Sequence, residues 1–243
     1  MDIYKSWLVT SPIAHRGLWS QELPENSLAA FEAAIKSGFA IELDVRLLDD
    51  GTVVVFHDDS LARMTGKDGY VSALTKDSLS SYALQGTDNT IPTLSEALTL
   101  IDGKVPVLIE VKNAGKVGKL EQAVIDLLSS YEGDVAVQSF NPHSLGYFAG
   151  NAPHILRGQL ASYFRHNKEI SWFKRAALKR LKLNNISKPD FIGYNHKDLP
   201  NKYVKAAGLP TLAWTVRSNA EFEAVVHNCD NVIFEKFIPR VTE

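Results

Sequence analysis

The stretch Ile41-Glu42-Leu43-Asp44-Val45 decides how this chain is interpreted. It has the apolar, β-branched character of a core strand, yet it contains two acidic residues. Side chains alternate along a strand, so Glu42 and Asp44 lie on the same face. Burying a carboxylate without a partner is costly. The stretch therefore predicts a buried strand with a polar site built on it.

Similar apolar runs recur through the chain and alternate with helical patterns. They are short and rich in β-branched residues, as expected for parallel strands covered on both faces. No Gly/Ser-rich or Pro-rich linker separates them, so we expect one domain over residues 1–243. Core strands are expected at residues 13–16, 41–45, 105–111, 135–140, 155–160, 191–195, 211–216 and 231–235.

Helices are expected in the gaps between these strands. The helix at residues 27–37 has Asn26 or Ser27 as its N-cap and Gly38 as its stop. Repeated strand–helix units in one undivided chain predict an α/β fold of the TIM (β/α)₈ barrel type. Further helices are expected at residues 95–101, 116–131, 141–149, 196–207 and 218–227.

One strand lies outside this barrel count. Residues 53–57 follow residues 41–45 after a gap that is too short for a crossover helix. The pair Asp50-Gly51 is typical of a hairpin turn. We therefore expect an extra hairpin strand at the barrel mouth, followed by a short capping insertion at residues 58–91.

The composition is that of a soluble globular protein. Lys plus Arg is 26 and Asp plus Glu is 28, which gives a net charge of −2 and no general attraction to nucleic acid. Cys229 is the single cysteine, so no internal disulfide is possible. Residues 1–10 do not resemble a signal peptide, and no apolar stretch approaches the ~20 residues of a membrane span. A cytoplasmic protein without membrane insertion is expected.

A third acid points to a metal site. Glu110 lies near the end of the next core strand, with Lys112 on the same face. In a barrel, Glu42, Asp44 and Glu110 would meet near the rim, where active sites form. Their repulsion would be relieved by Mg²⁺ or Ca²⁺, which prefer carboxylate oxygens. Pairing of each acid with a basic residue is the structural alternative, and it is less favourable for all three together.

Two histidines frame this acidic cluster. His15 ends the first strand and His57 ends the extra hairpin strand. Either could be a structural histidine, but together beside a metal site they are better explained as a general acid–base pair. Arg16 can bind phosphate oxygens in a bidentate manner, and Lys112 offers a point charge. The set predicts cleavage of a phosphodiester.

The chain carries a long, ordered set of motifs: His15-Arg16-Gly17, Pro24-Glu25-Asn26-Ser27, Ala30-Phe31, Ile41–Val45, Asp50-Gly51, His57-Asp58, Leu61–Gly66, Ile91–Leu94, Glu110-Val111-Lys112, Ser139-Phe140 and Trp214-Thr215-Val216. This set resembles the motifs of the glycerophosphodiester phosphodiesterase family. The resemblance extends from about residue 13 to residue 235. One departure is Glu235, which stands where many members have Thr-Asp before a proline. A second is the insertion at residues 58–91, which is short for the family.

The resemblance implies a TIM barrel, a divalent metal, and release of glycerol 3-phosphate and an alcohol from a glycerophosphodiester. It also implies that a neighbouring glycerol hydroxyl attacks phosphorus first and that water opens the resulting cyclic phosphate. The residues that it assigns are, for catalysis, His15 and His57, for the metal, Glu42, Asp44 and Glu110, and for the substrate site, Arg16, Lys112, Glu25 and Asn26.

Several alternatives stay open from the sequence. A lysophospholipase D that acts on lysolipids would share the same chemistry. A Schiff-base lyase that uses Lys112 would leave the histidines and acids without a role. A phosphate-binding protein without activity would not need all of these residues. Trp214 is either an aromatic wall for the glycerol or a core residue.

The most basic part of the chain is residues 164–188. It could contact an anionic membrane at its surface. The pattern favours an ordinary outer helix instead, with Trp172, Phe173 and Ala177 on its apolar side. A small-molecule substrate is the expected partner, and the sequence does not indicate an oligomeric state.

Overall fold

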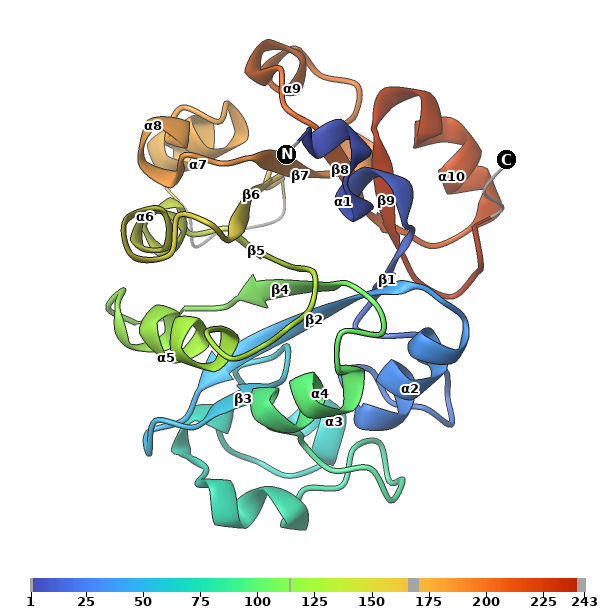
Figure 1. Cartoon of the computed structure of the whole chain (residues 1–243), viewed down its shortest axis with the longest axis vertical. Helices are drawn as coiled ribbons and strands as arrows, with labels where there is room; N and C mark the ends of the chain where they lie inside the picture. Colours follow the sequence, from blue (N-terminus) through green and yellow to red (C-terminus); the bar gives the residue numbers. More distant parts are fainter. Residues whose placement is uncertain (1, 114, 166–170, 240–243) are drawn as a thin grey trace. The chain divides into compact units, whose positions relative to one another are not determined.

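The computed structural model describes residues 2–113, 115–165 and 171–239 of the chain. These residues form two compact units (Figure 1). The N-terminal unit is Ala14–Val135. The C-terminal unit combines residues 2–13 with the described residues from 136 to 239. Each unit is described separately below.

Strands alternate with helices along the chain, as the sequence predicts. The fold class is α/β, of the TIM (β/α)₈ barrel type with one extra strand, and that prediction is confirmed. The described strands are β1 (Ile13–His15), β2 (Ala40–Leu47), β3 (Val53–Val55), β4 (Val107–Val111), β5 (Val135–Ser139), β6 (Leu156–Ala161), β7 (Phe191–Asn195), β8 (Thr211–Val216) and β9 (Asn231–Phe234).

The N-terminal unit is built around β2. This strand pairs in parallel with β4 and antiparallel with β3, and it also pairs with β1. The hairpin expected from Asp50-Gly51 is therefore present, with Gly51 at φ 88°. Residues Ala40 to Val45 of β2 are all buried, and they include the acidic residues Glu42 and Asp44. The helices α2 (Leu28–Lys36) and α4 (Leu94–Ile101) pack against each other on the outside of these strands (Figure 1).

The helices begin where the capping residues predict. Ser27 accepts a hydrogen bond from Ala30 N and caps α2, and Gly38 follows its end at φ 71°. Residues 196–207 do not form one helix, so that prediction is wrong: Pro200 interrupts them, because proline lacks the N–H that a continuous helix needs. The helix expected at 116–131 is shorter than predicted at both ends. The described α-helices are α1 (Trp7–Thr10), α2 (Leu28–Lys36), α3 (Ala62–Thr65), α4 (Leu94–Ile101), α5 (Lys119–Leu128), α6 (Pro142–Asn151), α7 (Trp172–Lys179), α8 (Asn184–Ser187), α9 (Lys202–Ala207) and α10 (Asn219–Val225), and the 3₁₀ helices are η1 (Ile3–Lys5), η2 (Val71–Ala73), η3 (Lys76–Ser81), η4 (His196–Asp198) and η5 (Val226–Asn228).

The insertion at residues 58–91 is a small folded cap. It contains α3, η2 and η3, and it has a hydrophobic cluster of its own. Buried side chains from the cap pack there against residues of the β2–β3 hairpin region, so the cap is held on the N-terminal unit by apolar burial. The cluster comprises Leu48, Val54, Phe56, Leu61, Met64, Val71, Leu74, Leu79, Leu84 and Ile91.

The C-terminal unit carries the parallel run β5-β6-β7-β8-β9. The start of the chain also belongs to this unit, because Leu8 of α1 is fully buried and α1 contacts β9. Among the described residues, no helix is both long enough and apolar enough to cross a membrane.

Candidate active site

Three carboxylates converge within the N-terminal unit. Glu42 and Asp44 come from β2 and Glu110 comes from β4, and one oxygen of each lies within 4.8 Å of the others. Asp44 and Glu110 meet because they are register partners on neighbouring parallel strands. All three side chains are buried. The acids that the sequence singled out are thus brought together into a group that could hold a metal ion.

Two cations offset part of this negative charge. Lys112 Nζ lies 2.7 Å from Glu110 Oε1 and 3.2 Å from Asp44 Oδ1, and Arg16 Nε lies 3.2 Å from Asp44 Oδ2. Although burial opposes the effect, the charges of Lys112 and Arg16 lower the pKa of Asp44 well below its usual range. Burial, reinforced by the charges of Asp44 and Glu110, raises the pKa of Glu42 well above its ordinary value.

The carboxylate cluster suits a hard divalent cation. Burial raises the pKa of Glu42, the negative charges of Asp44 and Glu110 add to this effect, and the charge of Arg16 opposes it. Asp44 Oδ1 is buried and accepts no hydrogen bond from the part of the chain that the structure describes. Carboxylate oxygens are the ligands that Mg²⁺ and Ca²⁺ prefer. The residues present therefore fit such an ion.

The first candidate histidine ends β1 beside the cluster. His15 Nε2 lies 4.0 Å from Glu42 Oε2, and the chain turns after it with Arg16 at φ 60°. Arg16 N donates to the same Glu42 oxygen at 3.0 Å. Asn26 N donates to Arg16 O at 2.9 Å, and Asn26 Nδ2 donates to Asp44 Oδ2 at 2.8 Å. Asn26 thus fixes the loop after β1 and orients the Asp44 carboxylate.

The second candidate histidine follows β3, which the hairpin carries back alongside β2. Arg46 of β2 holds its backbone, because Nε and Nη2 donate to His57 O at 2.9 and 2.7 Å. His57 Nδ1 lies 2.6 Å from Asp58 Oδ1. Burial lowers the pKa of His57 below its ordinary value of 6.5. The ring is therefore neutral at neutral pH, and with Nδ1 donating to Asp58, Nε2 is the nitrogen that can exchange a proton.

Arg63 of α3 links the two sides of the site. Its Nε donates to Asp58 Oδ2 at 2.5 Å, and its Nη1 and Nη2 donate to Glu25 at 3.0 and 2.6 Å. Arg16 Nη1 donates to Glu25 at 2.7 Å. Although burial opposes it, the hydrogen bond from Arg63, together with the one from His57, lowers the pKa of Asp58 to about 2. A continuous chain of polar contacts thus connects His57 with Arg16.

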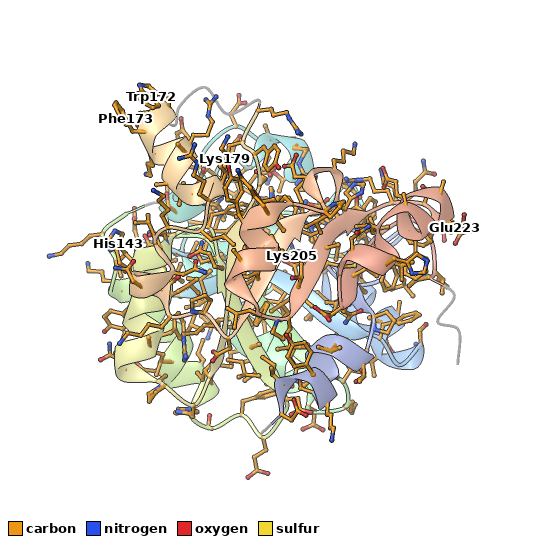
Figure 2. All side chains as sticks on the ribbon, turned by 90° about the horizontal axis from the view of Figure 1, so that it is seen from above. His143, Trp172, Phe173, Lys179, Lys205 and Glu223 are labelled. Atoms are coloured by element: carbon orange, nitrogen blue, oxygen red, sulfur yellow. The ribbon has the colours of Figure 1, made fainter. Side chains whose placement is uncertain are left out.

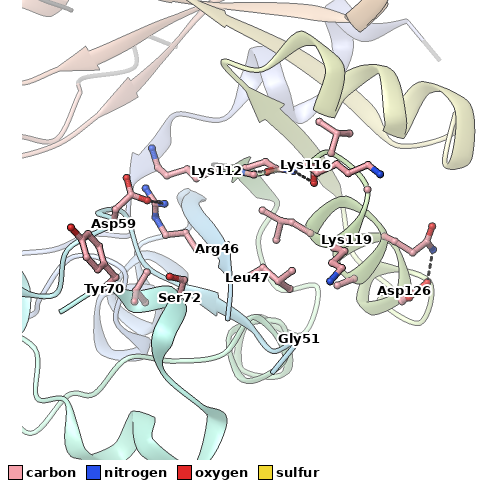
Figure 3. Close-up of a pocket in the computed structure, with 18 residues that line it drawn as sticks. Arg46, Leu47, Gly51, Asp59, Tyr70, Ser72, Lys112, Lys116, Lys119 and Asp126 are labelled. Carbon is pink, nitrogen blue, oxygen red and sulfur yellow. Dashed lines mark hydrogen bonds and ion pairs between the residues drawn. The ribbon is translucent and has the colours of Figure 1, made fainter. Parts of the chain in front are cut away.

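A cavity of about 1230 Å³ is lined by residues that include Arg46 and Lys112 (Figure 3). Lys112 and Arg46 link this cavity to the candidate catalytic residues. Both line the cavity, while Lys112 also contacts Glu110 and Arg46 also holds the backbone of His57. Tyr70 and Asp59 lie on the cap side of the cavity, and Lys119 of α5 lies on the opposite side.

The loop between β4 and α5 forms one wall of this cavity. It is held by Glu121, a fully buried residue whose carboxylate accepts from Gly118 N at 2.7 Å and from Asn113 Nδ2 at 2.7 Å. The N-terminal unit therefore offers a charged centre and an adjoining cavity with a fixed wall.

Comparison with known proteins decides the family. The model of the glycerophosphoryl diester phosphodiesterase family matches residues 15–234, which is most of the chain. The chain belongs to this family. The protein is thus an enzyme of the phosphoric diester hydrolase class.

Individual relatives agree with this assignment. This phosphodiesterase is 36% identical over 162 residues to a glycerophosphodiester phosphodiesterase of Caldanaerobacter subterraneus, with 62% of this chain and 66% of that protein covered. It is 26% identical over 239 residues to a glycerophosphodiester phosphodiesterase of Bacillus subtilis, with 88% and 79% covered. A solved structure of a phosphodiesterase from Oleispira antarctica, in complex with the product sn-glycerol 3-phosphate, is similar with a TM-score of 0.80 and 26% identity, with 94% of this chain and 93% of that chain covered.

Two residues considered from the sequence lie in the other unit of the phosphodiesterase. Trp214 is on β8, where its ring meets Phe140 edge to face with centroids 5.4 Å apart. Its Nε1 is buried and makes no hydrogen bond within the described residues. Glu235 follows β9 and accepts from Arg217 Nε at 2.6 Å. The role of Trp214 in substrate binding stays a prediction.

The sequence interpretation missed the supporting residues of the phosphodiesterase site. Arg63 and Arg46 were not identified as parts of it, although Arg63 belongs to the motif at residues 61–66 that carries the family resemblance. A charged residue inside an otherwise uncharged family motif was the available signal. Its partner Glu25 is 38 positions away, so local spacing could not reveal the contact.

Proposed function

We propose that this phosphodiesterase hydrolyses glycerophosphodiesters to glycerol 3-phosphate and an alcohol. The observation that carries the proposal is the buried cluster of Glu42, Asp44 and Glu110 with His15 4.0 Å from Glu42. The product bound to the similar Oleispira antarctica enzyme, sn-glycerol 3-phosphate, supports the same class of substrate. A cytoplasmic location stays a prediction from the sequence.

The carboxylate cluster is the proposed site of a divalent cation, Mg²⁺ or Ca²⁺. When bound, the ion supplies positive charge that stabilises negative charge on the phosphate oxygens. Lys112 and Arg16 lie beside the cluster and are proposed to attract the same phosphate. An arginine can present two parallel N–H donors to it, and a lysine adds a point charge.

His15 and His57 are the proposed acid–base pair. One removes a proton from the attacking hydroxyl, and the other gives a proton to the departing alkoxide. The pair therefore gains one proton and loses one proton in this step. The contact with Asp58 holds His57 Nδ1 and leaves Nε2 for proton transfer. The lowered pKa of His57 keeps this ring neutral at neutral pH.

The cavity beside Lys112 is the proposed site of the alcohol group. Its volume of about 1230 Å³ exceeds the roughly 300–1,000 Å³ of most small-molecule pockets. A cavity of this size also has room for the acylglycerol part of a lysolipid, which favours a second candidate activity of the same chemistry, a lysophospholipase D that releases the head-group alcohol and leaves lysophosphatidate.

A Schiff-base lyase is disfavoured by the state of Lys112. Although burial opposes the effect, Asp44 and Glu110 raise the pKa of this ammonium group. The residue therefore stays protonated, whereas attack on a carbonyl requires the neutral amine.

The test is phosphodiester cleavage by purified, chelator-treated enzyme with Mg²⁺, Ca²⁺ or no metal. The substrates are glycerophosphocholine, glycerophosphoethanolamine and a lysophospholipid. The products measured are the free alcohol and either glycerol 3-phosphate or, from the lysophospholipid, lysophosphatidate. We expect metal-dependent release, and a loss of at least about 100-fold in turnover for His15→Ala and for His57→Ala. A thermal shift on metal addition, absent in Glu110→Gln, reports ion binding independently of activity.

His143→Ala is the matched control, because His143 is an exposed histidine on α6 (Figure 2). It should keep full activity. Full activity after exhaustive chelation would remove the metal from the proposal, and a His15 or His57 variant with near-normal turnover would remove that histidine. If folded, metal-loaded enzyme cleaves none of the substrates, the proposed substrate class is wrong.

A further inference from the structure

The first turn of α7 carries two large aromatic side chains that are mostly exposed to solvent. Trp172 is 66% exposed and Phe173 is 67% exposed. Their rings stack on each other, with centroids 3.4 Å apart and an angle of 28°. Figure 2 shows both at the outer tip of the helix. The apolar side that the sequence predicts for this helix includes Trp172 and Phe173, and in the structure these two side chains are exposed.

The same segment carries a strong positive charge. Between Ser171 and Lys188 there is no acidic residue, although the chain as a whole has a net charge of −2. Within the described part of the chain, none of Lys174, Lys182 and Lys188 forms an ion pair. The basic residues of the segment are Lys174, Arg175, Lys179, Arg180, Lys182 and Lys188.

The C-terminal half of α7 anchors the helix and leaves its first turn projecting. Leu178 and Leu181 are each 7% exposed, and Leu181 belongs to a core cluster with Ile192 and Tyr194. Tyr194 Oη donates to Lys179 O at 2.9 Å. The aromatic pair therefore stands on a fixed support. Residues 166–170 of the basic stretch considered from the sequence lie outside the described residues.

We infer that residues 171–188 form a docking surface for an anionic lipid bilayer. Tryptophan and phenylalanine enter the interfacial layer of a membrane, and lysine and arginine side chains around them meet anionic headgroups. A bilayer fits better than a nucleic-acid duplex, because the bases of a duplex are already stacked on one another and only its charged backbone faces a projecting apolar pair; a single strand, whose bases can stack on aromatic rings, is an outcome of the test below. Membrane binding by this surface is separate from the proposed function. Only its purpose rests on the proposed function: it would hold the enzyme where phospholipid breakdown supplies its substrate.

The test is binding of the full-length protein to phosphatidylcholine vesicles with and without phosphatidylglycerol, measured by co-sedimentation at low and high salt. Binding should require the anionic lipid and weaken with salt, because the attraction is screened. Trp172→Ala/Phe173→Ala and Lys174→Glu/Lys182→Glu should each weaken binding at least about tenfold. Lys205→Glu, an exposed charge reversal on α9 (Figure 2), is the control and should reduce binding much less.

Several results would overturn the inference. One is wild-type protein that does not bind anionic vesicles. Another is an aromatic double variant that binds them as well as wild type, which would mean that the aromatic pair does not contribute to binding. Stronger binding to a single-stranded oligonucleotide than to vesicles would assign the surface to nucleic acid. Unchanged circular dichroism excludes misfolding of the variants. Vesicle binding needs no catalysis, so failure of the proposed function would be recognised separately by the absence of phosphodiester cleavage.

Discussion

At the scale of single residues, the site depends on how its charges are paired. Glu25 accepts hydrogen bonds from both Arg16 and Arg63, and its pKa is lowered by them in spite of burial. Arg63 also holds Asp58, which in turn holds His57. A buried carboxylate that loses its partner is strongly destabilised, so such a network acts as a unit. Arg63 is therefore a positioning residue for the proposed acid–base chemistry.

Replacing Arg63 with alanine should lower kcat about tenfold or more, with a smaller effect on KM, because His57 loses its orientation. Without Arg63, the negative charge of Asp58 is less compensated and favours protonated His57. The pKa of His57, which burial holds below 6.5, should therefore rise. Whichever limb of the pH–rate profile His57 controls should move to higher pH, which a profile of glycerophosphodiester hydrolysis would show.

Arg63→Lys should restore part of the activity, because it keeps the charge but not both sets of hydrogen bonds. Lys67→Ala is the matched control. It removes one positive charge from the same cap, where Lys67 Nζ donates to Ser81 O and lies over the Tyr82 ring, away from the site. An Arg63→Ala profile identical in position to that of wild type would contradict the positioning role.

At the scale of elements, the turn between β1 and α2 decides whether the site can form. Gly17 has φ 82°, a conformation that residues with a side chain rarely adopt. A Cβ there would lie 2.9 Å from Ala30 C and from Phe31 Cδ1, so α2 packs directly on this turn. The close approach places Arg16, the preceding residue, against Glu42 and Asp44.

Gly17→Ala should lower the free energy of unfolding by about 2–4 kcal/mol, from backbone strain and steric overlap together. Gly38→Ala is the matched control, because Gly38 has φ 71° but a Cβ there meets nothing within 4 Å. It should cost only about 1 kcal/mol. Urea denaturation of both variants measures the difference, and equal losses would show that packing on Gly17 is unimportant.

The elements themselves were largely predictable from the sequence. The expected strands were found because apolar runs and alternation are local signals. One helix over residues 196–207 does not form, because Pro200 lies within the pattern and lacks the N–H that a continuous helix needs. The cap at residues 58–91 was expected only in outline, since its 3₁₀ turns have no strong periodic pattern. Its stability comes from a cluster that gathers side chains over more than forty positions, from Leu48 to Ile91.

At the scale of the whole molecule, the start of the chain completes the C-terminal unit. Asn231 Nδ2 donates to Leu8 O at 2.8 Å and to Ser11 O at 2.7 Å, across more than two hundred residues of sequence. These contacts join the segment of α1 to β9. Closing such a distant contact costs chain entropy, which the buried Leu8 side chain helps to offset.

Asn231→Ala should lower the free energy of unfolding by about 1–3 kcal/mol, because two backbone carbonyls lose their donor. Asn219→Ala is the control, since Asn219 is an exposed residue of α10 whose side chain makes no hydrogen bond within the described residues. Thermal unfolding would compare the two variants. An Asn231→Ala protein as stable as the control variant would mean that the contact with the N-terminal segment contributes nothing.

The sequence by itself determined the class of fold, the family and the convergence of Glu42, Asp44 and Glu110. Those conclusions rest on spacing along single strands and on motifs, which are local properties of the chain. Only the tertiary structure decided which charges pair, that Arg63 joins Asp58 to Glu25, and that Trp172 and Phe173 are exposed. The physical reason is that periodicity reports which face of an element is apolar, whereas the partner of a charge or an aromatic ring depends on where the rest of the chain returns.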